Sequence, residues 1–139
     1  MRFWDSAALV PLVVQQPMSS MVDQWCAADG SMVVWTLTPV EISSAIQRLL
    51  REQKITEAEA TDAERRASEL VRACHLVVDV ESVKPQAQRL LRLHTLRAAD
   101  ALQLGAAVEW TAGRPAGHTL HTLDTRVAAA ARREGFEVP

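Results

Sequence analysis

The stretch HTLHTLDTRVAAAARREG, residues 118–135, contains three features that together decide the fold. Residues 118–123 are typical of a short strand, and residues 124–135 are typical of a helix that stops at Gly135. Asp124 stands between them, directly after the predicted strand. A strand followed at once by a helix is the repeating unit of a parallel sheet covered by helices.

The same order of strand, acid and helix occurs at the start of the chain. Residues 2–4 are a short apolar strand, Asp5 follows, and residues 6–14 have a helical pattern. The remaining predicted elements are strands at 31–37, 75–80 and 136–138 and helices at 19–30, 38–53, 56–74, 82–94 and 95–107. This alternation predicts an α/β fold with a central, mostly parallel sheet of about four to five strands and helices on both faces.

Length and composition indicate one globular domain over residues 1–139. The apolar content of 48% is typical of a soluble protein that buries a sizeable core. Cys26 and Cys74 stand far apart and outside metal-ligand spacing, which favours a reducing, cytoplasmic location. The apolar run at 7–14 is interrupted by Pro11, and we expect no membrane span. The net charge of −2 argues against indiscriminate binding to polyphosphate.

Acidic residues follow three of the predicted strands. Asp5 and Asp124 come directly after strands, and Glu41 comes soon after another. Asp100 lies within the first two turns of the helix predicted at 95–107. Because parallel strands end at the same edge of a sheet, we expect these acids to converge there. Clustered carboxylates need a counter-ion, and an all-oxygen ligand set suits a hard cation such as Mg²⁺ or Mn²⁺.

Each acid also has a purely structural interpretation. Asp5 and Asp124 stand where an N-cap residue would lie. Glu41 is the last residue of TPVE, which matches a capping box. Asp100 shares a helix stripe with apolar residues, and its alternative partner is the Arg97 side chain three residues earlier. Both interpretations of each acid are open on these patterns alone.

Four stretches in the same order resemble the PIN-domain ribonucleases of the VapC toxin type: RFWDSAALVPLV, TPVEISSAI, LRAADALQLGAA and HTLDTRVAAAARREGF. The resemblance covers essentially the whole chain and implies a three-layer PIN-like fold. It also implies an Mg²⁺- or Mn²⁺-dependent endoribonuclease that hydrolyses RNA phosphodiester bonds, leaving 5′-phosphate and 3′-hydroxyl ends. The implied partners are the RNA substrate, a VapB-like antitoxin and a second copy of the chain, in the cytoplasm.

The resemblance also implies roles for particular residues. The acids implied to be both catalytic and metal-binding are Asp5, Glu41, Asp100 and Asp124. Ser6 and Thr122 match hydroxyl positions that contact the substrate or support the metal ligands, whereas Ala7 stands where a second hydroxyl is common. Four arginines on nearby helices are candidates for contacts with the RNA backbone: Arg48, Arg97, Arg126 and Arg132.

Two other functions fit parts of the pattern. A phosphoryl-transfer enzyme of the receiver type also places acids at strand ends, but it needs a lysine after a late strand. Lys54 and Lys84 are poorly placed for that role. A non-catalytic binding module on the PIN fold is the second alternative. The presence of all four acids argues against it, because degenerate sites tend to lose them.

Overall fold

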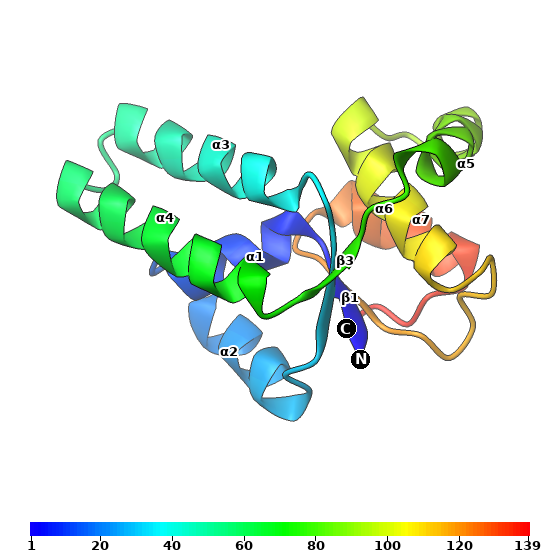
Figure 1. Ribbon diagram of the computed structural model, residues 1–139, viewed down its shortest axis with the longest axis horizontal. Helices are drawn as coiled ribbons and strands as arrows, with labels where there is room; N and C mark the ends of the chain where they lie inside the picture. The colour runs from blue at the N-terminus through cyan, green and yellow to red at the C-terminus, as the bar shows by residue number, and fades with distance from the viewer.

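The computed structural model describes residues 1–139 and shows a sheet between two layers of helices (Figure 1). The sheet has four strands, all parallel, in the order β3-β2-β1-β4. The strands are short: β1 (Arg2–Trp4), β2 (Met32–Trp35), β3 (His75–Val77) and β4 (Leu120–His121). The predicted α/β architecture with a parallel central sheet is confirmed.

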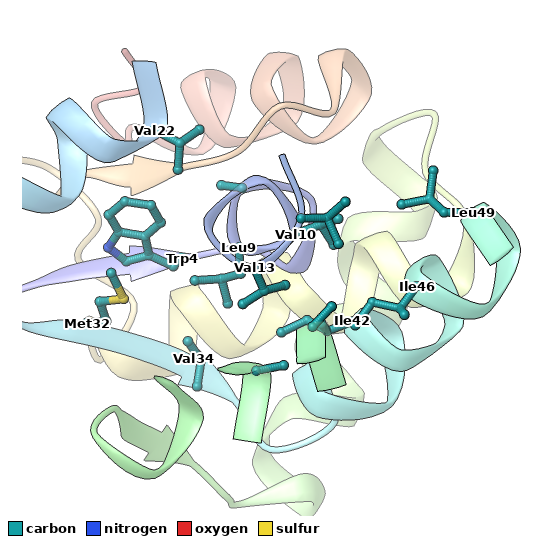
Figure 2. Close-up of a cluster of buried hydrophobic side chains, with 14 of the residues drawn as sticks. Trp4, Leu9, Val10, Val13, Val22, Met32, Val34, Ile42, Ile46 and Leu49 are labelled. Carbon is teal, nitrogen blue, oxygen red and sulfur yellow. The ribbon is translucent and has the colours of Figure 1, made fainter. Parts of the chain in front are cut away.

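Four helices cover the first face of the sheet: α1 (Ser6–Val13), α2 (Ser19–Ala28), α3 (Thr38–Arg51) and α4 (Glu57–Arg72). Trp4 of β1 and Val34 of β2 are completely buried against them. Figure 2 shows these side chains with Leu9 and Val13 of α1 and Ile42 of α3 in one apolar cluster. Each buried side chain of this size contributes roughly 1.5–3 kcal/mol, so this cluster holds α1 and α3 against the strand ends.

Three helices cover the opposite face: α5 (Val80–Leu93), α6 (Ala98–Trp110) and α7 (Thr125–Glu134). Because successive strand residues point to opposite faces, Phe3 and Val33 lie in this second core beside Leu104 of α6. Gly105 lets α6 approach α5 closely. A Cβ atom there would lie 3.2 Å from the Ala87 nitrogen of α5. The position of α6, which carries Asp100, is therefore fixed by packing on both sides.

The structure corrects several predicted element ends. The strands predicted at 31–37 and 118–123 are shorter, at Met32–Trp35 and Leu120–His121. The predicted strand at 75–80 ends at Val77, because the Asp79 carboxylate accepts the Ser82 N–H (3.0 Å) and starts α5 at Val80. The predicted strand at 136–138 is a single bridge between residues 119 and 137. The helix predicted at 95–107 begins at Ala98. None of the helices is long and apolar enough to cross a membrane.

Candidate active site

Asp5 lies at the end of β1 with only 4% of its surface exposed. It precedes α1, but its side chain makes no capping hydrogen bond, so the N-cap interpretation of its carboxylate is wrong. The carboxylate instead accepts the hydroxyls of Thr122 (2.6 Å) and Ser6 (3.3 Å). Burial raises the pKa of Asp5 to about 6, and the negative charges of Glu41 and Asp124 add to that effect. Asp5 is therefore a buried carboxylate without a full counter-charge.

Glu41 lies in the first turn of α3 and does not cap it. The N-cap residue is Leu37, so the capping box suggested by TPVE is wrong. The Glu41 carboxylate accepts the Ser6 hydroxyl (2.9 Å) on one oxygen and the Gln103 amide (3.0 Å) on the other. Burial raises the pKa of Glu41, the charge of Asp100 raises it further, and the two hydrogen bonds offset part of the increase. Tertiary contacts therefore direct this carboxylate toward Asp5.

Asp124 is the N-cap of α7, as its place after a strand allowed. One carboxylate oxygen accepts the N–H groups of Arg126 (2.8 Å) and Val127 (3.1 Å). The other oxygen lies 3.5 Å from the Arg126 guanidinium. Burial alone would raise the pKa of Asp124, but these hydrogen bonds and the guanidinium outweigh it and keep the pKa below its usual value. Capping and a place in the site are thus compatible for this acid.

Asp100 is in the first turn of α6, where its side chain retains 18% exposure. Its carboxylate accepts the backbone N–H of Arg97 (3.0 Å), and the nearest cation is the guanidinium of Arg126 at 3.9 Å. The alternative of an ion pair with the Arg97 side chain is therefore wrong. The Arg126 guanidinium lies within 4 Å of both Asp100 and Asp124 and partly compensates these two acids.

One cleft of about 600 Å³ collects the predicted residues. The predicted site residues that line it are Asp5, Ser6, Glu41, Asp100 and Asp124, together with Arg48 and Arg97. Thr122 lies behind Asp5 and is 4% exposed. Arg132 points elsewhere, because its guanidinium donates to the Val138 carbonyl (3.0 Å). The expected convergence of acids at the carboxyl ends of β1, β2 and β4 is thus what the structure shows.

The donors in this cleft fit a hard, hydrated cation. The charged ligands are carboxylate oxygens, no histidine or cysteine lines the cleft, and the buried Asp5 has no cation beside it. No group of three carboxylate, imidazole or thiol side chains is close enough to hold a metal ion by itself. Mg²⁺ typically keeps several waters and uses one or two carboxylates, so a hydrated ion matches this spacing better than a closed cage of side chains.

Gln103 is a site residue that the sequence interpretation missed. It lies one turn after Asp100 on α6 and is 1% exposed, and its amide donates to both Thr38 (3.1 Å) and Glu41 (3.0 Å). In the sequence, Gln103 has the same signal as Asp100, namely a polar side chain among apolar neighbours on the same helix.

Known proteins similar to this chain include two curated ribonucleases from Mycobacterium tuberculosis. They are Ribonuclease VapC45 of strain CDC 1551 / Oshkosh and Ribonuclease VapC49 of strain ATCC 25618 / H37Rv. Each is 30% identical over 137 residues, which cover 98% of this chain and 92% of the relative. No protein-family model matches. The fold is similar to that in the crystal structure of FitAcB from Neisseria gonorrhoeae (TM-score 0.67, 16% identity, covering 99% of this chain and 96% of that one).

Proposed function

The chain belongs to the VapC family of ribonucleases, and we propose that its acidic cleft hydrolyses RNA phosphodiester bonds with Mg²⁺ or Mn²⁺ as the toxin of a toxin–antitoxin pair. The observation that carries this proposal is the single cleft lined by all four acids. When bound, the cation would stabilise negative charge that develops on the phosphate and make hydroxide available near neutral pH. Asp5 and Asp100 are the proposed direct ligands, with Asp124 a ligand directly or through water.

The remaining residues have roles that follow from their contacts. Glu41, whose pKa is raised mainly by burial, is suited to orient the attacking water or to accept its proton. The Ser6 hydroxyl lies 2.9 Å from Glu41 and 3.3 Å from Asp5, so its one hydrogen donates mainly to Glu41 while the oxygen stays beside both carboxylates. Thr122 donates to Asp5 and accepts the Asp124 N–H (3.0 Å), which ties the first acid to the fourth. These hydroxyls are positioning groups.

The arginines at the cleft supply the opposite charge. Arg48 and Arg97 line it beside the acids. A guanidinium presents several donors in a planar fork that matches phosphate oxygens, which supports a role for these two side chains in binding the RNA backbone. No lysine lines the cleft. The lysine-dependent phosphoryl-transfer alternative thus has no support from the geometry.

We expect the purified protein to cleave single-stranded RNA in Mg²⁺ or Mn²⁺ and to lose that activity in EDTA, because the side chains in the cleft that can bind a metal ion offer oxygen, with no histidine or cysteine among them. The measurement is a gel assay of end-labelled RNA, with the chemistry of the new ends determined. Glu41→Gln, which keeps the side-chain length but removes the proposed catalytic carboxylate, is the control for contaminating nuclease and should cleave much less RNA than wild type. Undiminished cleavage in EDTA would contradict the metal mechanism. Folded, Mg²⁺-loaded protein that binds RNA and leaves it intact would favour the binding module instead.

The proposed toxin role and partners have a separate test in cells. We propose that the protein acts in the cytoplasm as a homodimer with a VapB-like antitoxin. Exposed apolar side chains support such protein contacts: Leu76 on edge strand β3, Val78 just after it and Val40 in the first turn of α3. Expression of the chain alone should arrest bacterial growth, whereas co-expression with its antitoxin, which we expect the gene directly upstream to encode, should restore it. Normal growth with soluble, RNA-cleaving protein would remove the toxin role and leave the ribonuclease.

A further inference from the structure

Gln103 is a buried amide whose hydrogen bonds all lead to α3. The residue lies on the inner face of α6 and is 1% exposed. A buried amide without partners destabilises a fold by about 1–3 kcal/mol, so its contacts matter for stability as well as for placement. Its Nε2 donates to the Thr38 hydroxyl (3.1 Å) and to the Glu41 carboxylate (3.0 Å), and the Thr38 hydroxyl lies 3.5 Å from its Oε1.

The two contacts of Gln103 differ in what they do. The bond to Thr38 joins α6 to the first residue of α3 and would be sufficient to dock the two helices. The bond to Glu41 reaches an oxygen of a carboxylate whose other oxygen accepts the Ser6 hydroxyl (2.9 Å). Glu41 is thus held from two sides, by α1 and by α6. A neutral amide can donate here without adding charge to a cleft that already contains four acids.

We propose that Gln103 is a positioning residue that fixes the Glu41 carboxylate in the cleft and sets its place relative to Asp100. Gln103 and Asp100 are one turn apart on α6, so the same rigid helix carries one acid and orients another. Small displacements of such groups strongly reduce rates, because reacting atoms must be held at defined distances. The expected effect on RNA cleavage rests on the proposed ribonuclease function, whereas the expected effect on the position of Glu41 does not.

Gln103→Met and Gln103→Leu both remove the amide donor, the first at a length similar to that of glutamine. Thr38→Val is the matched control, because it removes the other partner of Gln103 and leaves the bond to Glu41 intact. In RNA cleavage, both Gln103 variants should lower kcat by about 10–100-fold with less than about a twofold change in KM. Thr38→Val should keep kcat within about threefold of wild type, even if its melting temperature falls as far as that of the Gln103 variants.

A double-mutant cycle with Glu41→Gln separates positioning from a general loss of structure. If Gln103 acts through Glu41, Gln103→Met should add no further loss of kcat in the Glu41→Gln background. Additive losses, or a Thr38→Val enzyme as slow as Gln103→Met, would overturn the proposal.

Crystal structures of the metal-free variants provide a measurement that does not depend on activity. The Glu41 carboxylate should keep its hydrogen bond to Ser6 in Thr38→Val and lose it in both Gln103 variants. An unmoved Glu41 in both Gln103 variants would refute the positioning role even if the kinetics agreed. Should wild-type protein cleave no RNA, the proposed function fails, while the crystallographic comparison still decides the role of Gln103.

Discussion

An Asp5→Asn variant is expected to lose RNA cleavage by more than about 100-fold. Asp5 is a proposed direct ligand of the metal ion, and losses of 10–100-fold are already typical for residues that only support such a ligand. In EDTA at pH 8 the same variant should be more stable than wild type. Burial raises the pKa of Asp5 from 3.8 to about 6, so the folded protein then holds a charge that the unfolded chain exposes to water. A difference of about 2 in pKa corresponds to roughly 3 kcal/mol, and we expect a gain of about 2–3 kcal/mol.

The gain should depend on pH in a defined direction. Above pH 6 Asp5 is ionised in both states, and the folded state is penalised in full. As the pH falls from 6 to 3.8, the folded state binds the proton first, so the penalty shrinks, and below 3.8 it is gone. His121 acts in the opposite sense: burial lowers its pKa from 6.5 to about 4, so both proteins lose stability as the pH falls through that range. The difference in stability between variant and wild type cancels the contribution of His121 and leaves that of Asp5 and the acids coupled to it.

Urea unfolding at pH 8 and pH 4 measures this difference, with Asp62→Asn as the control. Asp62 is on the outer face of α4, where its side chain is 53% exposed and pairs with Arg65. Losing such a pair should change stability by less than about 1 kcal/mol and leave cleavage unaffected. An Asp5→Asn protein that is less stable than wild type at pH 8, or equally stabilised at both pH values, would contradict the assignment of Asp5 as an uncompensated buried charge.

The sheet and the convergence of the acids were predictable because both depend on chain order. Apolar strands that alternate with amphipathic helices predict a parallel sheet, and parallel strands end at one edge. Asp5 follows strand β1 directly and Asp124 follows strand β4 after two residues, so their place at that edge required no knowledge of side-chain contacts. The short strands also explain the errors at element ends. Strand β3, for example, is stopped by the capping of the next helix at Asp79.

The contacts inside the cleft were not predictable, because they join residues far apart in the chain. Glu41 fits a local capping pattern, yet its oxygens accept from Ser6 and from Gln103, which is 62 residues away. The local signal favoured a cap, whereas a buried partner on another helix decided the outcome. The Gln103 amide has no recognisable motif, since its role depends on how closely α6 approaches α3. Sequence patterns therefore located the acids and left their hydrogen-bond partners undetermined.

Asp100 shows why the acids of one cleft should not respond alike to the loss of charge. Repulsion between four carboxylates predicts that neutralising any of them stabilises the metal-free protein. The surroundings of Asp100 oppose this effect. Its carboxylate caps α6 through the Arg97 N–H at 3.0 Å, it lies 3.9 Å from the Arg126 guanidinium, and its side chain is 18% exposed. Asp5, in contrast, is buried and has no cation beside it.

An Asp100→Asn variant should therefore lose cleavage by more than about 100-fold while its stability in EDTA changes by less than about 1 kcal/mol. The asparagine oxygen can still accept the Arg97 N–H, and the half-exposed Arg126 loses only a weak pair. Leu104→Ala, one turn along α6 at a fully buried position, should lose roughly 2–5 kcal/mol and serves as the control for core damage. A clear stabilisation like that of Asp5→Asn would show that repulsion dominates at Asp100 as well. A destabilised variant that still cuts RNA would make Asp100 a helix cap alone.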